Sequence, residues 1–490
     1  MKSLDAYTIQ HEPVSSIELM ERASRGFVTW FTEQFNALKK VGIVCATGNN
    51  GGDGLAIARM LNDWGYPIKV WIVKGSVPES EDFKTNFARL KNEKIPLHEI
   101  ATASDRGLFN DRDVIIDALF GYGLSRPPEG IYAQVIECIN SSRATRIAVD
   151  IPSGLMADKP SIGPIVKADH TVTFHSPKLS FLLPQYHEFV GNWTVIDIGL
   201  HKEFLRTEKT NHLLSTRKSV AKLLRPRKKF DHKGTFGHAL LVAGSHGKIG
   251  AAVLSGRAIK RAGAGLLSIY SPICGYEILQ SSVPEAMVIT DPEKDFISGC
   301  PDLDKFNVLG IGPGLGQHEK TVRALAKFLE HGKPCVIDAD ALNIIASNRE
   351  LLHLVPKGSI LTPHPKEFER LVGGWKDDFE RLERQLDLAR KINGVVVLKG
   401  AFSSVALPDG KVYFNSTGNP GMATGGTGDV LTGILTGILA QGYDVGEAAI
   451  LGVYLHGSAG DLAVLETGPD SLIASDLIRF LPNAFRQLSR

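Results

Sequence analysis

The sequence predicts an α/β protein with two domains. Its 490 residues exceed what one hydrophobic core usually organises, so two domains are the first expectation and three the alternative. In both halves short β-rich runs alternate with helical patterns, and several runs are apolar on both faces, as in parallel sheets covered by helices. The segment from residue 201 to about residue 233 is instead polar and basic. We therefore place the domain junction early in it, which gives domains 1–205 and 206–490.

The composition is that of an ordinary soluble enzyme, with 43% hydrophobic and 22% charged residues. The net charge of +2 predicts no strong attraction to nucleic acid or anionic membranes, and the basic run 225–229 has no interleaved aromatic residues for stacking. The five cysteines never form a C-x-x-C pair, which indicates reduced thiols. Because we find no signal pattern and no apolar run long enough to cross a bilayer, we expect a cytoplasmic protein without nucleic-acid or membrane partners.

The first domain is expected to begin with a helix, because Ser15 and Glu18 have the spacing of a capping box. Six β-rich runs follow, at residues 41–46, 68–73, 113–120, 146–151, 170–175 and 193–200. Their alternation with helical patterns predicts a Rossmann-like, doubly wound sheet.

The stretch "GNNGGDGLAIARML" follows the first of these runs and opens a helix, where free N–H groups favour an anion. A tight turn that needs glycine is the simpler interpretation. Asp117, Asp150 and Ser153 follow other strands, and doubly wound sheets bind ligands beyond the carboxyl ends of their strands. Asn50, Asp117 and Ser153 offer the oxygen atoms that a hard cation prefers. Lys74 is a candidate acid or base, or else a solvated lysine at a strand end.

Three motifs in this order, "GNNGGDGL", "DALFGYGL" and "VDIPSG", resemble the N-terminal epimerase domain of the NAD(P)H-hydrate repair enzymes. The resemblance implies that Asn50, Asp117 and Ser153 bind potassium, and that Asp150 contacts the substrate near the reacting carbon. Lys74 and Asp150 are then the candidate acid–base groups. The loops implied to hold the hydrated nucleotide are Asn49, Asn50, Gly51, Gly52 and Asp53, and Gly121, Tyr122, Gly123, Leu124, Ser125, Arg126 and Pro127. Relatives usually carry a longer leader before "LDAYTI", so part of the first helix or of a dimer contact is expected to be missing.

The second domain is expected to hold six further strands, at residues 238–244, 266–272, 306–312, 334–340, 359–364 and 394–400. After them, "TGGTGDVLTG" puts Asp429 beside glycine N–H groups at a helix start. Such N–H groups suit a transferring phosphoryl group, and a carboxylate beside them can take a proton from a hydroxyl. A glycine-rich turn capped by Asp429 is the alternative. His364 lies between two prolines that stiffen its loop, and Lys399 ends a strand, a suitable position for a nucleotide diphosphate.

Together, "KGTFGHALLVAGS", "GPGLG", "DADALN", "LTPHPKE", "LKGA" and "GGTGDVLTG" resemble the ADP-dependent NAD(P)H-hydrate dehydratase, a member of the ribokinase-like superfamily. The resemblance implies that the hydrate site is formed by Ala251, Gly314, His364 and Asp429. It also implies an ADP site formed by Lys399, Gly400, Ala401, Phe402, Ser403 and Gly428. The family usually has glycine where Lys366 stands, and often threonine where Ser403 stands.

The two resemblances imply a repair enzyme for NADH and NADPH hydrated at carbon 6 of the nicotinamide ring. The first domain would interconvert the R and S hydrates with bound K⁺. The second would phosphorylate the S hydrate from ADP, with Mg²⁺ and with Asp429 as general base, and loss of phosphate would restore the dinucleotide and leave AMP. Relatives suggest a homo-oligomer. Two alternatives stay open: a small-molecule kinase for the second domain, and a non-catalytic nucleotide or protein sensor for the first.

Overall fold

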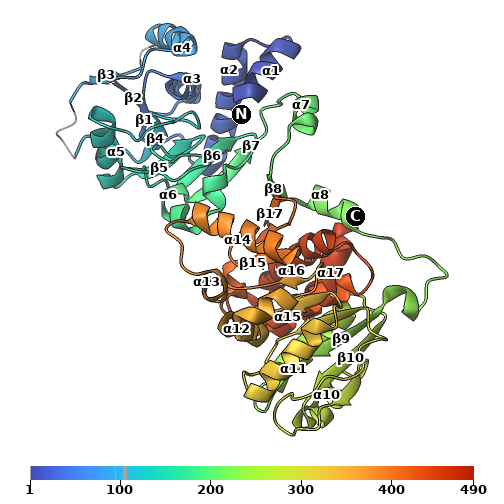
Figure 1. Cartoon of the computed structure of the whole chain (residues 1–490). Coiled ribbons are helices and arrows are strands. Elements are labelled where there is room, and N and C mark those ends of the chain that lie inside the picture. Colours follow the sequence, from blue (N-terminus) through green and yellow to red (C-terminus); the bar gives the residue numbers. More distant parts are fainter. Residues whose placement is uncertain (1, 94, 103–106, 490) are drawn as a thin grey trace. The chain divides into compact units, whose positions relative to one another are not determined.

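The chain divides into two compact α/β units, residues 1–209 and 210–490, which we call unit 1 and unit 2 (Figure 1). The computed structural model describes residues 2–93, 95–102 and 107–489. The predicted α/β class is confirmed in both units. The predicted junction after residue 205 lies four residues before the division at 209.

The described part of unit 1 contains one parallel sheet with the strand order β3-β2-β1-β4-β5-β6-β7. The strand order reverses between β1 and β4, so the sheet is doubly wound. Its strands are β1 (Val41–Cys45), β2 (Ile68–Val73), β3 (Leu97–Ile100), β4 (Val114–Ala118), β5 (Thr145–Val149), β6 (His170–Phe174) and β7 (Asn192–Ile196). Six of these strands are the predicted ones. The sequence missed β3, an edge strand of four largely exposed residues that carries no apolar run.

The helices of unit 1 are α1 (Lys2–His11), α2 (Ser16–Gln34), α3 (Asn49–Asp63), α4 (Glu81–Lys91), α5 (Ile131–Ser141), α6 (His187–Val190) and α7 (Lys202–Thr207). The capping box predicted at the start of α2 is confirmed. Glu18 N–H donates to Ser15 Oγ, and Ser15 N–H donates back to Glu18 Oε2 at 2.8 Å.

Both faces of this sheet are buried, which explains why its strands read as continuous apolar runs. Alternate residues of β1 point to opposite sides. Ile43 belongs to a core with Phe27 of α2 and Leu55 of α3, whereas Val44 belongs to a second core with Val135 of α5. Functional groups are therefore restricted to the ends of the strands.

The described part of unit 2 contains one larger sheet with the order β11-β10-β9-β12-β13-β14-β15-β16-β17-β8. Its strands pair in parallel except for β16, which is antiparallel to both neighbours. They are β8 (His212–Ser215), β9 (His238–Val242), β10 (Leu266–Ser271), β11 (Met287–Thr290), β12 (Val308–Ile311), β13 (Cys335–Ile337), β14 (Ile360–Leu361), β15 (Val395–Leu398), β16 (Ser404–Ala406) and β17 (Val412–Asn415).

Four strands of unit 2 were not predicted, namely β8, β11, β16 and β17. All four have only three or four residues and lie at or near a sheet edge, so each offers too short a run to stand out in the sequence. The polar segment 201–233, in which the sequence places the domain junction, also contributes β8 to the sheet. Within it, Leu213 and Leu214 pair with Tyr413 and Phe414 of β17 and complete the sheet.

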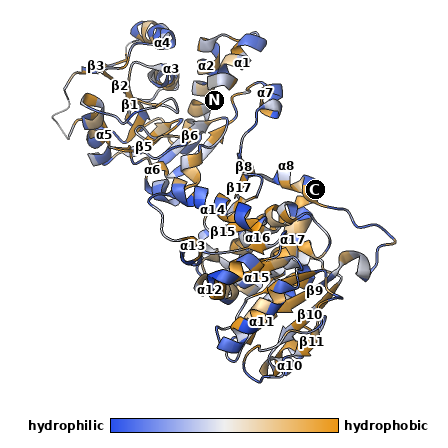
Figure 2. Ribbon diagram, viewed as in Figure 1, coloured by the Kyte–Doolittle hydropathy of each residue, from blue (hydrophilic) through white to orange (hydrophobic). Residues whose placement is uncertain are grey.

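The helices of unit 2 are α8 (Arg217–Val220), α9 (Ile249–Arg261), α10 (Tyr276–Ser282), α11 (Glu319–Glu330), α12 (Ala339–Ser347), α13 (Pro365–Val372), α14 (Asp378–Ile392), α15 (Thr427–Leu439), α16 (Val445–Thr467) and α17 (Ala474–Leu488). Hydrophobic residues gather on the strands and on α15–α17 (Figure 2). Helices α9 and α15 pack at very short range through Gly433 and Gly437, since a Cβ at Gly433 would lie 2.4 Å from the carbonyl oxygen of Ser255.

Helix α16 corrects the expectation that no apolar run is long enough for a bilayer. It has 23 residues, and its most apolar window has a mean hydropathy of 1.4, so by length and composition it could span one. However, 72% of that window is buried, and α16 packs between α15 and α17. Burial of most of this helix accounts for its apolar sequence.

We predict that Gly433→Val lowers the free energy of unfolding of unit 2 by about 1–3 kcal/mol, because the new side chain must displace the backbone of α9. Scanning calorimetry of the whole chain measures the effect as a lower transition temperature. The matched control is Gly250→Ala in α9, where a Cβ meets nothing within 4 Å. An unchanged transition in Gly433→Val would contradict the close packing of α9 and α15.

Candidate active sites at the carboxyl ends of the two sheets

In unit 1, the ends of β4 and β5 bring two predicted cation ligands into direct contact. Ser153 donates to Asp117 from its backbone N–H at 2.8 Å and from its hydroxyl at 2.6 Å. Both side chains are fully buried, and burial raises the pKa of Asp117 to about 6. No ion pair reaches Asp117 within the described residues, so its buried charge has no cationic partner there.

Asn50, the third predicted ligand, lies in the first turn of α3 and faces the loop after β4. Its Oδ1 is 3.2 Å from the position of a Cβ on Gly121, and Asp150 Oδ2 is 3.5 Å from the same point. A side chain at residue 121 would therefore crowd both groups. The Nδ2 of Asn50 is buried without a hydrogen-bond partner among the described residues, which is typical of a site shaped for a ligand.

Asp150 follows β5, and both of its carboxylate oxygens accept hydrogen bonds. Its backbone has a φ of +67°, a strained value for a residue other than glycine. Its Oδ1 accepts from Lys178 Nζ at 2.7 Å and from Thr173 Oγ1 at 3.2 Å, and its Oδ2 accepts from the backbone N–H of Tyr122 at 3.2 Å. The side chains of Asp150 and Lys178 are only 6% and 4% exposed. A buried carboxylate and a buried amine thus share one site.

The sequence analysis did not name Lys178; it named Lys74 as the candidate acid or base, and the structure places Lys74 away from Asp150. Lys74 is half exposed and forms an ion pair with Glu99 at 2.8 Å. It follows β2, which is three strand positions from β5, or about 14 Å at the usual spacing. Lys178 follows β6, the neighbour of β5, so a lysine after the adjacent strand was the available signal.

The two predicted nucleotide loops of unit 1 border this site. Asn49, Asn50, Gly51, Gly52 and Asp53 form the first turns of α3. Gly51 is needed for packing, since its Cβ would lie 1.7 Å from the carbonyl oxygen of Ala46. Burial raises the pKa of Asp53, and Asp150 adds to the rise. The segment 121–127 is half-buried to exposed at the rim, where Tyr122 Oη donates to Asp5 of α1 at 2.8 Å.

A hollow of about 840 Å³ lies in unit 1 between α2, α3 and α4, apart from the site described above. It is open and lined by charged side chains. Arg59 and Arg89 there are paired with Glu21 at 2.5 and 2.9 Å. None of the predicted site residues lines it, so size does not identify the site in this unit.

In unit 2, the glycine-rich stretch forms a loop and the start of α15. Gly426, with a φ of +91°, precedes the helix, and its missing side chain makes room for Leu254. Asp429 lies in the first turn of α15, where N–H groups lack helical partners. Burial is the main cause of a pKa of about 6 for Asp429; the charge of Asp338 adds to the rise and that of Lys399 opposes it. No ion pair involves Asp429 among the described residues.

A network of buried polar groups supports this helix start. Lys399 Nζ donates to Asp338 Oδ1 at 2.8 Å, and Thr432 Oγ1 donates to Asp338 Oδ2 at 2.7 Å. A Cβ on Gly428 would lie 3.6 Å from Lys399 Nζ. The lysine therefore places its charge beside the glycine loop, and Glu367 Oε2 lies 3.9 Å from the same amine.

His364 is the N-cap of α13, a role that the sequence did not predict. Its Nδ1 accepts from the backbone N–H groups of Lys366 and Glu367, which places the proton of the neutral ring on Nε2, and burial lowers its pKa. Glu367 completes the capping box and is 5% exposed; burial raises its pKa. The exposed Lys366 side chain takes no part in this cap.

A cavity of about 420 Å³ lies between the start of α15, the start of α13 and the loops that face them. Its lining includes three of the four predicted hydrate-site residues, Ala251, Gly314 and Asp429. Glu367 lines it in place of the fourth, His364. Sequence analysis also missed Asp340, which accepts from the N–H of Gly316 at 2.8 Å and holds the facing loop.

The predicted ADP segment Lys399, Gly400, Ala401, Phe402 and Ser403 connects β15 to β16. Gly400 N–H donates to Ser403 Oγ at 3.2 Å, so serine provides the hydroxyl that threonine usually provides in the family. Gly400 and Ala401 are exposed, whereas the amine of Lys399 points to Asp338. Each unit thus has its own polar site at the carboxyl ends of its strands, which defines a two-site α/β enzyme.

Comparison with known proteins identifies the family. The family model described as YjeF-related protein N-terminus matches residues 16–180, and the one described as NAD(P)H-hydrate dehydratase matches residues 239–483. A bifunctional NAD(P)H-hydrate repair enzyme of Moorella thermoacetica is 38% identical over 508 aligned residues, which cover 100% of this chain and 96% of that protein. The chain belongs to the family of bifunctional NAD(P)H-hydrate repair enzymes.

Two solved structures resemble unit 2. One is an ADP/ATP-dependent NAD(P)H-hydrate dehydratase from Bacillus subtilis, co-crystallised with ATP and Mg²⁺; it is 32% identical, with 57% of this chain and 100% of that chain covered and a TM-score of 0.50. The other is a ribokinase-like superfamily protein from Enterococcus faecalis, 26% identical, with 58% and 98% covered and a TM-score of 0.50. The predicted ribokinase-like class of the second domain is confirmed.

We predict that Lys178→Met destabilises unit 1 by about 3–5 kcal/mol, because Asp150 would remain buried without its cationic partner. Lys74→Met, which breaks an exposed pair, should cost only about 0–1 kcal/mol. Calorimetry on the two whole-chain variants measures the difference. Equal transition temperatures would contradict the assignment of Lys178, and not Lys74, to the buried site.

Proposed function

We propose that the chain repairs hydrated NADH and NADPH in two steps. Unit 1 interconverts the R and S hydrates, and unit 2 dehydrates the S hydrate, consuming ADP and releasing AMP and phosphate. The observation that carries the proposal is Asp429, a partly buried carboxylate in a 420 Å³ cavity at a glycine-rich helix start. Membership of the repair-enzyme family supports the choice of substrate.

In unit 2, Asp429 takes the proton from the ring hydroxyl, whose oxygen then attacks the terminal phosphoryl group of ADP. The bond from that phosphorus to the AMP oxygen breaks. The phosphorylated hydrate loses phosphate from carbon 6 and a proton from carbon 5, which restores the double bond. Phosphate is a far better leaving group than hydroxide, so the nucleotide drives the dehydration.

The N–H groups of the glycine loop and the amine of Lys399 are the groups that stabilise the transferring phosphoryl charge. His456 of α16 has a positioning role, because its Nε2 donates to the carbonyl oxygen of Thr427 at 2.9 Å. Burial lowers the pKa of His456 to about 4, so its ring stays neutral and holds the loop without adding charge. Lys399, Gly400, Ala401, Phe402, Ser403 and Gly428 form the proposed ADP site.

Asp338 and Glu367 fit a role in holding Mg²⁺ with the diphosphate, because they are buried oxygen ligands within 4 Å of the Lys399 amine beside the loop. Such an ion would neutralise phosphate charge. The relative from Bacillus subtilis was crystallised with ATP and Mg²⁺.

In unit 1, Asp150 and Lys178 are the proposed acid–base pair. Carbon 6 is bonded to the ring nitrogen, whose lone pair can expel the hydroxyl group. Lys178 donates a proton to the departing oxygen, and Asp150 takes a proton from the water that then adds to the planar ring cation. Addition to either face of the cation gives both epimers, and the proton returns from Asp150 to Lys178 across their 2.7 Å contact. Asn49, Asn50, Gly51, Gly52, Asp53 and the segment 121–127 would hold the nucleotide.

Asn50, Asp117 and Ser153 are the proposed potassium ligands. Asp117 is a fully buried carboxylate without an ion-pair partner among the described residues, so a monovalent cation would compensate its charge. Asn50 would offer its Oδ1 to the cation. We further propose a homo-oligomer that acts in the cytoplasm on small-molecule substrates.

The proposal is tested by recovery of the reduced-nicotinamide absorbance from a mixture of R and S NADH hydrate. With ADP, we expect full recovery in the wild type and a rate about 10²–10⁴-fold lower in Asp429→Ala. Asp150→Ala should stop after the S hydrate is consumed, because the R hydrate is no longer converted. Matched reactions in K⁺ and Na⁺ test the cation, and reactions with ATP or no nucleotide test the phosphoryl donor. No recovery with either nucleotide would overturn the dehydratase and favour a small-molecule kinase.

The pKa of Asp429 predicts the pH dependence of dehydration. A base with a pKa of about 6 loses its proton as the pH rises through that value, so the rate on S hydrate should fall about tenfold per pH unit below it and level off above it. Asp429→Asn should lose this inflection. A wild-type profile that is flat through pH 6 would contradict the general-base role.

A further inference from the structure

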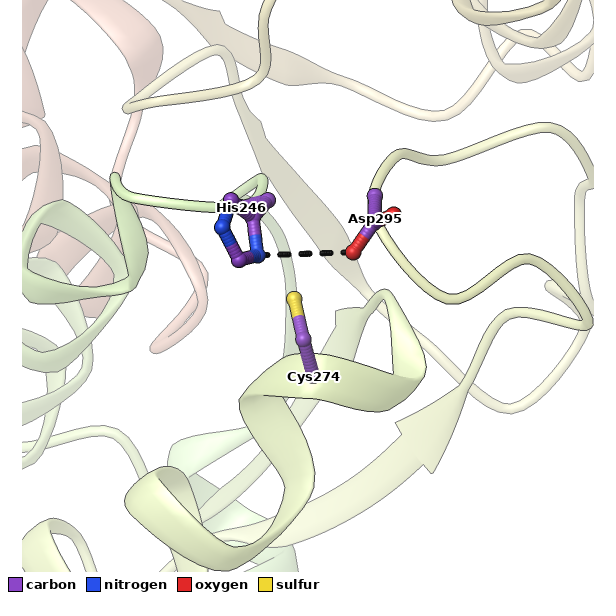
Figure 3. A group of neighbouring side chains, drawn as sticks. All are labelled: His246, Cys274 and Asp295. Atoms are coloured by element: carbon purple, nitrogen blue, oxygen red, sulfur yellow. Dashed lines mark ion pairs between the residues drawn. The ribbon is translucent and has the colours of Figure 1, made fainter.

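Three side chains of unit 2 that the proposed reaction does not use lie together at the surface. They are His246, Cys274 and Asp295, and one ligand atom from each lies within 4.8 Å of the other two (Figure 3). His246 Nδ1 and Asp295 Oδ1 are 3.4 Å apart. In Figure 3 the sulfur of Cys274 points from its short helical turn toward the other two side chains.

The topology of the sheet explains why these residues meet. They follow β9, β10 and β11, which are adjacent strands in the order β11-β10-β9 and run in parallel. Each residue therefore comes from a loop at the same carboxyl edge. The three residues are far apart in the sequence and share no motif, so sequence analysis could not have grouped them.

Backbone hydrogen bonds join the three loops. His246 N–H donates to the carbonyl oxygen of Asp295 at 2.8 Å, and Cys274 N–H donates to that of Lys294 at 3.0 Å. The loop after β11 is also held by hydrogen bonds to the buried Asp291. This carboxylate accepts from the N–H groups of Ser298 and Gly299 in the same loop, and from Tyr270 Oη of β10. The backbone beneath the three side chains is thus preorganised.

The chemistry of these three ligand atoms determines which class of metal ion they would bind. Imidazole nitrogen, thiolate sulfur and carboxylate oxygen are the ligands of zinc and of similar borderline transition metals, whereas Mg²⁺ and K⁺ prefer oxygen alone. Two light ligand atoms on a tetrahedral zinc ion are about 3.4 Å apart, given bonds of about 2.1 Å. The nitrogen and oxygen of His246 and Asp295 have this separation.

We propose that His246, Cys274 and Asp295 form a binding site for a divalent transition-metal ion of the zinc class, with one coordination position left for water. The side chains of His246 and Asp295 are 76% and 52% exposed, so the site is open to ions from solution and can close by side-chain rotation. On binding, the Cys274 thiol releases its proton to solvent and binds as thiolate.

The site adjoins the dehydratase cavity without being part of it. Gly247 and Lys248, which follow His246 directly, line that cavity. An ion at this site would tie the loop after β9 to the loops after β10 and β11. It therefore stabilises one wall of the cavity, and this inference stands whether or not the proposed dehydration is correct.

The test uses Co²⁺ as a spectroscopic probe on the reduced, metal-free full-length protein, because Co²⁺ bound to thiolate gives a sulfur-to-metal charge-transfer band. We expect one Co²⁺ per chain with this band, displaced by an equivalent of Zn²⁺. The band should be absent in Cys274→Ser, and binding should weaken at least tenfold in Asp295→Asn. Cys300→Ser is the matched control, since Cys300 is another half-buried cysteine of unit 2 and should retain the band.

A second measurement keeps the test independent of any loss of folding. Zn²⁺ should raise the transition temperature of unit 2 by a few degrees in the wild type and in Cys300→Ser, and not in Cys274→Ser. The proposal is overturned if the wild type shows no charge-transfer band, or if Cys274→Ser retains the band. Equal Zn²⁺ stabilisation of all three proteins would also overturn it, because the ion would then bind elsewhere.

Discussion

Both active sites depend on one constraint, which is that a parallel sheet covered on both faces can expose functional groups only at the ends of its strands. In unit 1, the loops after β5 and β6 supply Asp150 and Lys178. In unit 2, the ends of β13 and β15 supply Asp338 and Lys399. Strand order, and not distance along the chain, therefore decides which side chains meet.

The two carboxylates that we propose as catalytic, Asp150 and Asp429, lie in different electrostatic surroundings. Asp150 is buried with a lysine at 2.7 Å, and it lies in the turn after β5 with a strained backbone, a φ of +67°. Asp429 has no ion-pair partner among the described residues, and burial together with Asp338 raises its pKa to about 6. A paired carboxylate suits a site that must keep an acid and a base side by side. An unpaired one with a raised pKa suits a base that accepts a proton near neutral pH.

The sequence was most informative where chemistry follows a local motif. The positions of Asp150 at a strand end and of Asp429 at a glycine-rich helix start could be predicted, because each follows from one short stretch of sequence. Lys178 could not be found this way, because its importance comes from β6 lying next to β5 in the sheet. Lys74 has the same local pattern of a lysine at a strand end, but three strand positions separate β2 from β5. The cap formed by His364 was likewise hidden, since histidine is not a usual N-cap residue.

The short strand β8 has a consequence for how the second half of the chain can be separated from the first. The dehydratase family match begins at residue 239, whereas β8 covers His212–Ser215 and pairs with β17. A fragment cut at the family boundary would leave the backbone of β17 unpaired along a sheet edge, and such edges recruit strands from other molecules. A soluble, independently folding second half should therefore start before His212, which makes this piece of polar sequence a protective cover as well as a connection.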